Sequence, residues 1–150
     1  MASPQASGHF INRNKVTMYD FDYSNSAVDV AWVDMQNYKE FIVVAFLSVP
    51  AAGAISQFSL IANADSAGGG SDVTIKTHAL GSSPDAVGDY VVLSCTAEEI
   101  AQEAADAGVT GVRYVSANLT LSQAAAEAVV TYVLCHPRFA YSGLTADLIS

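Results

Sequence analysis

Polar and apolar side chains alternate along much of this chain with a period of two, the spacing expected of a β-strand that is buried on one face. Residues 1–15 are polar and show no period, so we expect them to form an extended N-terminal arm. Residues 142–150 likewise follow the last pattern as a C-terminal tail. The strand-like patterns predict six strands, at residues 16–23, 27–33, 72–79, 89–95, 112–121 and 127–135.

Two further strands differ from these six. Residues 40–49 (EFIVVAFLSV) are almost continuously apolar, which is typical of a central strand that is buried on both faces. A turn-forming segment at residues 50–54 (PAAGA) separates this run from residues 55–64, where a slip in the alternation predicts a β-bulge. We expect the two runs to pair as a hairpin.

One helix interrupts the strands. Thr96 followed by Glu99 has the spacing of a capping box, and residues 97–107 are good helix formers with an acidic first turn. Gly108 stands where a left-handed residue would end the helix. About eight short strands with one helix inserted before a final hairpin predict a mainly β fold, an antiparallel sandwich or barrel that spans residues 16–141. Doubly wound nucleotide-binding folds are disfavoured because strands and helices do not alternate.

Composition narrows the function classes. Of the 150 residues 14% are charged, well below the roughly 25% of an average protein, and the net charge is -9. Nucleic acid is not expected as a partner, because its binding depends on clustered Lys and Arg. The apolar stretch 41–61 is interrupted by Pro50 and Gly53, so no membrane span is expected. No apolar secretory segment appears near the N-terminus, and we expect synthesis in the cytoplasm.

Few residues point to chemistry, and we predict neither a catalytic residue nor a cofactor. Cys95 and Cys135 lie in apolar runs and are expected to be buried small hydrophobes. No two histidines have metal-site spacing, and Ser94 lacks the context of a nucleophile. Gly68–Gly70 lacks the lysine of a phosphate-binding loop and is predicted to be a mobile loop. The three histidines, expected to be structural or exposed, are His9, His78 and His136.

Carboxylates near loop ends offer one alternative. Asp20 and Asp22 alternate on one predicted strand, and further aspartates flank the loops. Oxygen ligands of this kind can gather Ca²⁺, although the ladder of a calcium-binding loop is absent. The flanking aspartates are Asp65, Asp72, Asp85 and Asp89.

Aromatic residues divide into two groups. Those inside strand patterns are expected to be core residues. Phe139 and Tyr141 lie in the irregular C-terminal segment, where they are candidates to anchor a contact between subunits. The expected core aromatics are Trp32, Phe41, Phe46 and Phe58.

The order of elements resembles that of small tailed-bacteriophage virion proteins. A polar turn (33–38, VDMQNY) leads into the long hydrophobic strand, and a Gly-rich loop and the short acidic helix at 97–107 follow. Val112-Arg113-Tyr114-Val115 then opens an alternating strand, and the last apolar strand ends in Pro137-Arg138-Phe139-Ala140-Tyr141. Within that group the chain is similar to capsid decoration, or cement, proteins over roughly residues 30–141.

The resemblance implies a jelly-roll-like β-sandwich without catalytic residues that binds the outer capsid lattice, often as a trimer. It implies the major capsid protein as partner and the virion surface as location. The alternatives are a phage neck or tail component, a carbohydrate-binding module that uses Tyr19, Tyr23 or Tyr141, and a hydrolytic enzyme. The N-terminal arm and the irregular segment that follows the last strand supply the candidate partner-binding residues Phe10, Ile11, Arg13, Arg138, Phe139 and Tyr141.

Overall fold

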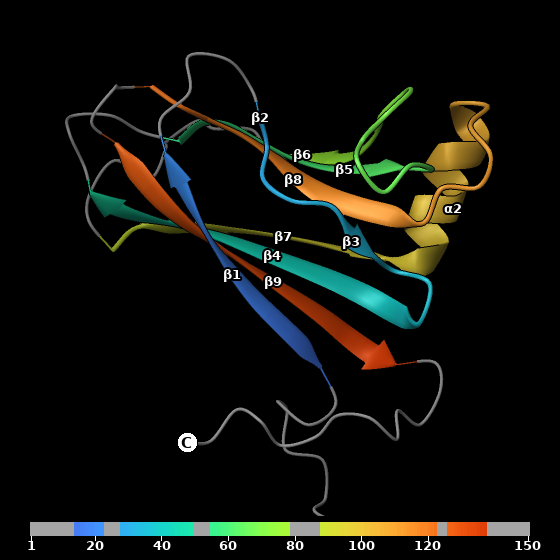
Figure 1. Cartoon of the computed structure of the whole chain (residues 1–150), viewed down its shortest axis with the longest axis horizontal. Helices are drawn as coiled ribbons and strands as arrows, with labels where there is room; N and C mark the ends of the chain where they lie inside the picture. The colour runs from blue at the N-terminus through green and yellow to red at the C-terminus, as the bar shows by residue number, and fades with distance from the viewer. Residues whose placement is uncertain (1–13, 23–27, 50–54, 79–87, 123–125, 138–150) are drawn as a thin grey trace, which may run out of the picture.

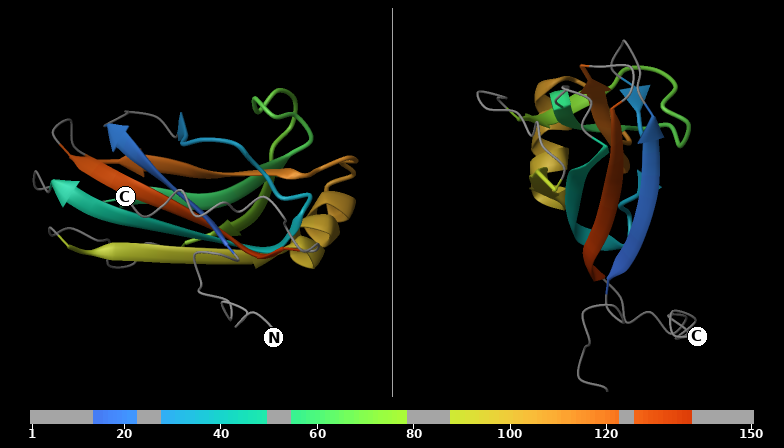
Figure 2. Two further views of the ribbon diagram at one scale, coloured as in Figure 1. Left: turned by 60° about the horizontal axis from the view of Figure 1, so that its bottom comes forward. Right: turned by 90° about the vertical axis from the view of Figure 1, so that its left-hand side faces the viewer.

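The structure, a computed structural model, describes residues 14–22, 28–49, 55–78, 88–122 and 126–137. Within these ranges two antiparallel β-sheets pack face to face, and one helix stands at the end of the sandwich (Figures 1 and 2). The predicted fold class, a mainly β antiparallel sandwich with one short helix, is confirmed. Both terminal arms lie outside the described residues, except for Asn14 and Lys15.

The first sheet has the strand order β1-β9-β4-β7. Strand β4 pairs with β9 on one side and with β7 on the other, so the long apolar run forms a central strand as predicted. The strands of this first sheet are β1 (Lys15–Asp22), β9 (Glu127–Pro137), β4 (Tyr38–Val49) and β7 (Tyr90–Thr96).

The second sheet has the order β2-β8-β5-β6, and β3 also pairs with β8. The segment predicted as one strand at 27–33 is therefore divided into the two short strands β2 and β3. Register shifts along β5 confirm the predicted bulge. The strands of this sheet are β2 (Val28–Asp29), β3 (Val33–Asp34), β8 (Tyr114–Leu121), β5 (Ile55–Asn63) and β6 (Val73–Thr77).

The strand pairs are nested along the chain. β5 pairs with β6, β4 with β7, β2 and β3 with β8, and β1 with β9, all antiparallel. This is the pattern of one long hairpin rolled into two sheets, the jelly roll.

Both predicted hairpins, 40–49 with 55–64 and 112–121 with 127–135, are wrong. β4 and β5 lie in different sheets, as do β8 and β9. Turn residues show where a chain reverses but not which sheet it enters next, and a five-residue connection is long enough to cross the roughly 10 Å between packed sheets.

The core lies between the sheets and is built from alternate residues of every long strand. Phe41 and Phe58 are fully buried, as predicted. Phe46, however, is 40% exposed, because it lies one strand position out of phase with Phe41 and so points to the opposite face. Trp32 is only partly buried, between β2 and β3. These two residues were wrongly predicted to be core.

Helix α2 (Ala97–Asp106) closes one end of the sandwich. The predicted capping box is present: the Glu99 N–H donates to Thr96 Oγ1, and the Thr96 N–H donates to Glu99 Oε2. Gly108 has a φ of +69° and follows the helix end, as predicted. Ile100 and Ala104 form the buried side of the helix.

Tyr132 joins the two sheets. Its ring lies in the core, edge-on to Phe41 with a centroid separation of 4.9 Å, and its hydroxyl reaches the gap between β2 and β3. There the Ala117 N–H donates to Tyr132 Oη at 2.7 Å, and Ser116 Oγ lies 3.3 Å from the same oxygen. The side chain thus supplies the acceptor that an uninterrupted strand would have supplied to β8.

The loop between β5 and β6 contains the glycine run. Gly68 has a φ of +73°, and a Cβ atom at this position would lie 2.4 Å from Trp32 Nε1. No other residue can therefore occupy this position without displacing the indole ring. The loop covers Trp32, which explains why this ring is only partly exposed.

Candidate interaction face

The outer side of the first sheet carries rows of apolar side chains. The register aligns Val16 with Val133 and Ile42, and aligns Met18 with Thr131 and Val44. The next row contains Val129, Phe46 and Tyr90. We call this surface the apolar face and define it as Val16, Met18, Ile42, Val44, Phe46, Tyr90, Val92, Ser94, Val129, Thr131 and Val133.

Much of the apolar face is open to water. Met18 is 66% exposed and Tyr90 64%, and Val92, Phe46 and Val16 range from 46% to 39%. Isolated apolar residues at a surface are ordinary, whereas a contiguous apolar patch is often functional, which makes this face the candidate interaction site.

Strand β4 shows how the sequence produces this surface. Phe41, Val43, Ala45 and Leu47 point inward and are fully buried. The residues between them, such as Val44, are as apolar but point outward. We expected both faces of this run to be buried; among the described residues, only the inner face is.

The apolar face is also uncharged. None of its described side chains ionises near neutral pH, and the neighbouring charged residues lie toward the strand ends, at Lys39 and Glu40 on one side and Asp89 and Glu127 on the other. Asp20 holds the corner position opposite Val129, and its side chain is outside the description. A chain of net charge -9 therefore keeps one broad neutral surface.

The outer side of the second sheet is chemically different. Asn118 Nδ2 donates to Asp29 Oδ1 at 2.8 Å, and Gln57 Nε2 donates to Asn118 Oδ1 at 3.2 Å. Ser59 and Thr77 hydrogen-bond across β5 and β6. We call this surface the polar face and define it as Asp29, Gln57, Ser59, Thr74, Thr77, Asn118 and Thr120.

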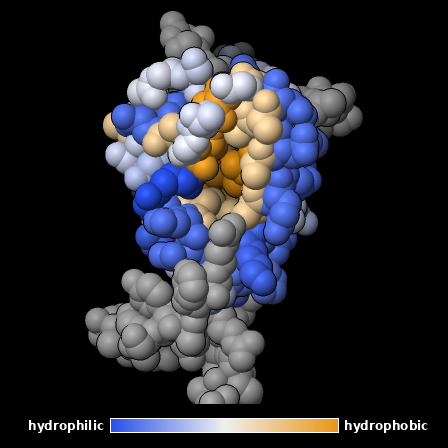
Figure 3. Space-filling model, turned by 90° about the vertical axis from the view of Figure 1, so that its right-hand side faces the viewer, coloured by the Kyte–Doolittle hydropathy of each residue, from blue (hydrophilic) through white to orange (hydrophobic). Residues whose placement is uncertain are grey.

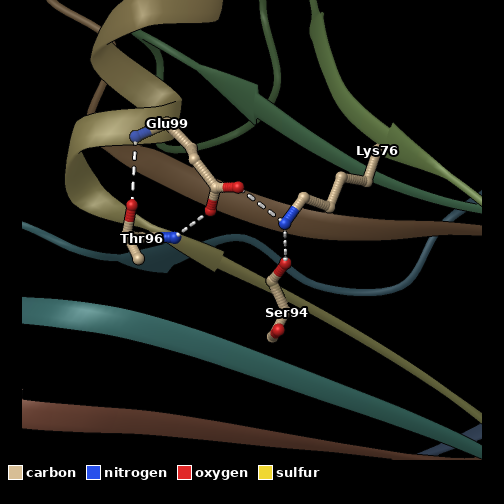
Figure 4. Close-up of polar contacts among 4 residues, drawn as sticks. All are labelled: Lys76, Ser94, Thr96 and Glu99. Carbon is tan, nitrogen blue, oxygen red and sulfur yellow. Dashed lines mark hydrogen bonds and ion pairs between the residues drawn. The ribbon is translucent and has the colours of Figure 1, made fainter.

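Lys76 closes the side of the sandwich between the edge strands β6 and β7 (Figure 4). Its ammonium group donates to the Ser94 carbonyl at 2.7 Å and lies 2.8 Å from Glu99 Oε1. The hydrogen bond from Lys76, together with the Thr96 N–H, lowers the pKa of Glu99. A lysine that occupies an edge carbonyl hinders the addition of a further strand. The arrangement protects the β7 edge of the first sheet and leaves its outer face open.

The end of the molecule near α2 carries a second polar arrangement. The Arg113 guanidinium pairs with the Asp34 carboxylate and lies over the Tyr114 ring, 5.0 Å from its centroid. Burial opposes ionisation of Asp34, but Arg113 and the Gln36 N–H outweigh it and lower the pKa of this carboxyl. In Figure 3 this end shows a hollow where apolar residues gather inside a hydrophilic border.

The two cysteines are free and buried, as predicted. Cys95 pairs with Phe41 and Cys135 with Glu40, adjacent residues of β4 that point to opposite sides of the sheet. Burial raises the pKa of the Cys95 thiol to about 12 and raises the pKa of Cys135 as well. Neither thiol is activated as a nucleophile at neutral pH.

Asp65 and Asp72 form hydrogen bonds within their own loop. Asn63 Nδ2 donates to Asp72, the Asp65 N–H donates back to Asn63, and Asp65 accepts from the Ala67 N–H. Asp85 and the side chains of Asp20 and Asp22 lie outside the description. In the described ranges no group of three or more His, Cys, Asp or Glu side chains is placed to hold a metal ion.

The other histidine and tyrosine predictions can be placed in part. The His78 N–H donates to the Phe58 carbonyl, and His136 is exposed, with Nε2 3.5 Å from Glu40. His9 lies outside the described residues. Tyr19, expected to be exposed, is partly buried and packs edge-on against Tyr132, because its strand position points inward.

None of the six candidate partner-binding residues can be placed. Phe10, Ile11, Arg13, Arg138, Phe139 and Tyr141, together with the sugar-stacking candidate Tyr23, lie outside the described residues. The apolar face, by contrast, was missed as a site. Its signal was present in residues 40–49, which are apolar at both odd and even positions. In the described part of the chain no helix is long and apolar enough to cross a membrane.

Comparison with protein-family models and with curated proteins finds no match. Among solved structures, a chain of infectious bursal disease virus, Gx strain, is similar over 83% of this chain and 32% of its own length, with 9% identity and a TM-score of 0.43. A chain of the Gt strain is similar over 87% and 37%, with 13% identity and a TM-score of 0.33. This chain spans about a third of the length of each.

Proposed function

We propose that this chain is a non-enzymatic structural protein of a virus particle. The jelly roll is used by viral capsid proteins, lectin domains and cupins, so the fold alone does not choose a function. The observation that carries the proposal is the apolar face, a broad, neutral and half-exposed sheet surface on an otherwise acidic domain. Such a surface fits a subunit whose outer sheet is covered by a neighbour.

Within this class we propose the role of a decoration protein on the head of a tailed bacteriophage, with the major capsid protein as partner. Contacts that bridge neighbouring capsid subunits add buried area across each boundary and make the subunits harder to separate. A trimer would strengthen the attachment through multivalency. The residues proposed to contact the capsid are Phe10, Ile11 and Arg13 of the arm and Arg138, Phe139 and Tyr141 of the segment that precedes the C-terminal tail. A neck or tail component is the alternative with the same fold.

Particles assembled with and without the protein test this function. We expect particles that lack it to release their DNA at a lower temperature, and added purified protein to restore the difference. Equal release temperatures for both kinds of particle would contradict a reinforcing role.

A truncation tests the arm separately. It should remove residues 1–13 and keep Asn14, because Asn14 Oδ1 accepts a hydrogen bond from the His136 N–H and Lys15 begins β1. The truncated chain should keep its thermal stability and bind capsids more weakly. Capsid binding as tight as that of the intact chain would exclude the arm as an anchor.

Carbohydrate binding is the second candidate function, and the exposed ring of Tyr90 favours it. This ring is 64% exposed on a sheet face, where aromatic side chains can stack on sugars. A glycan array probed with the intact chain and with Tyr90→Ala tests it. Specific binding that the substitution abolishes would support this function over the structural one.

A further inference from the structure

We propose that the apolar face is a self-association surface, through which two copies of this chain pack their first sheets against each other. This inference does not depend on the viral role, because it concerns the purified chain alone. It predicts a dimer, whereas the resemblance to decoration proteins implies a trimer.

The first argument is the cost of leaving the apolar face in water. Met18, Tyr90 and Val92 are each close to half exposed or more. Four strands about 4.8 Å apart and about five residues long cover on the order of 250–300 Å². A standard interface buries about 800 Å² on each partner, so the apolar face is the size of an interface core that a polar rim would complete.

The second argument is charge, which selects the partner. Two copies with a net charge of -9 each repel one another wherever their acidic surfaces meet. The residues that define the apolar face are uncharged and Asp20 lies only at its corner, so two copies can meet here with little repulsion. A basic partner would instead be drawn to the acidic parts of the molecule. The chemistry that matches a neutral, apolar sheet is another neutral, apolar sheet.

The third argument is the geometry of face-to-face sheet packing, which the molecule already shows between its own two sheets. The inner side of β4 packs sheet on sheet through Phe41, Val43 and Leu47. The outer side offers Ile42, Val44 and Phe46, which are residues of similar kind and size. Two sheets pack in this way at about 10 Å when both faces are apolar. Pairing of identical faces is two-fold, so it gives a dimer; a trimer would need a different surface.

Sedimentation velocity of the full chain is the first test, with Val92→Glu and Met18→Glu as disruptive variants. Thr74→Glu is the matched control, since it places the same charge on the polar face. We expect the chain and the control to sediment as dimers, and each disruptive variant to weaken the dimer at least about 100-fold, because the two-fold would bury two unpaired carboxylates against apolar side chains in each dimer. Circular dichroism establishes whether each variant folds. The two disruptive sites lie on different edge strands, so if one variant does not fold, the other still tests the proposal.

Oxidation of methionine locates the contact without any substitution. Hydrogen peroxide should oxidise the exposed Met18 quickly in dilute protein and much more slowly in concentrated protein, where the dimer covers it. Met35 is 3% exposed inside the core and serves as the internal control, slow at both concentrations. A chain that is monomeric at about 100 µM, or an oligomer in which Met18 oxidises equally fast at all concentrations, would overturn the proposal.

Discussion

The outer faces of the two sheets differ although both sheets share one core. On the polar face, Asn118 is hydrogen-bonded to both Asp29 and Gln57, so these polar side chains satisfy each other's hydrogen-bonding groups. On the apolar face, Phe46 and Val92 offer only carbon to the solvent. Antiparallel sheets commonly have one buried side and one polar side, and the second sheet follows this rule.

The difference shows which sheet has an outer face that is not suited to contact with water. The outer surface of the second sheet suits a monomer, because most side chains of the polar face are hydrogen-bonded to one another or exposed to water, Thr120 Oγ1 being a buried exception. The first sheet has the composition of a layer that is covered twice, once by the second sheet and once by something outside the chain. Lys76 occupies only the β7 edge of this sheet, and β1 forms the other edge, so the expectation of cover on the face depends on the exposed apolar side chains themselves.

The largest expected effect separates the two sides of the first sheet. Phe41 and Phe46 lie on β4, and they are 0% and 40% exposed. Phe41→Ala should lower the free energy of unfolding by about 3–5 kcal/mol, because it removes a core ring and leaves a cavity. Phe46→Ala should lower that of the monomer by about 1 kcal/mol or less and weaken self-association instead. Urea unfolding in the monomeric Val92→Glu background measures the first difference, and equal losses would show that Phe46 is also core.

The sequence was sufficient for the elements and for most of the core. Alternation located the strands, and the spacing of Thr96 and Glu99 located α2, because both signals come from residues close in the chain. Phe46 was misplaced because a run that is apolar at every position does not reveal its inner phase. The phase is set by the partners of β4, which are distant in sequence.

The pairing of the hairpins and the location of the site could not be predicted for a related reason. Whether β5 pairs with β4 or with β8 depends on long-range contacts that no turn residue encodes. Tyr132 could not be identified from the sequence as the group that completes the β8 ladder. The apolar face also needed the register, since Met18, Thr131 and Val44 become neighbours only in the folded sheet. The sequence shows that these residues are apolar or neutral, not that they meet.

A second comparison concerns how much each of the two cysteines contributes to the loss of stability at alkaline pH. The Cys95 thiol has a normal pKa of 9.0 when unfolded and about 12 when folded. Between these values the unfolded chain loses a proton that the folded chain keeps, so the free energy of unfolding falls as pH rises, by on the order of a few kcal/mol. Cys95→Ala should flatten this fall between pH 9 and 11.

The matched variant is Cys135→Ala, on the opposite side of the same sheet. Burial raises the pKa of this thiol as well, but it is the less deeply placed of the two, so we expect a smaller flattening. Urea unfolding at a series of pH values gives both slopes. Identical slopes in the two variants would mean that the inner and outer sides of the sheet desolvate a thiol equally.

Tyr132→Phe tests the contact between the sheets with a smaller change. It keeps the ring against Phe41 and removes the oxygen that accepts from the Ala117 N–H. A buried donor left without its partner should lower the free energy of unfolding by about 1–3 kcal/mol. Hydrogen exchange should show faster opening of the Ala117 amide. Tyr19→Phe is the control, since it also removes one hydroxyl and keeps a ring that packs against Tyr132. An equal loss there would show that the effect does not come from the Ala117 hydrogen bond.

The smallest expected effect concerns Lys76, which links the two edge strands. Its ion pair with Glu99 is partly open to water, with side-chain exposures of 38% and 44%, so Lys76→Met should change the free energy of unfolding at neutral pH by about 1 kcal/mol or less. The pH dependence is the more specific readout. Because the folded state lowers the pKa of Glu99, its contribution is present above the unfolded value of 4.5 and is lost as the pH falls below it. Lys76→Met should reduce this acid-dependent loss, and Lys39→Met, an exposed lysine at the start of β4, should leave it unchanged. If both variants keep the full acid dependence, the bridge between the sheets does not hold the Glu99 carboxylate.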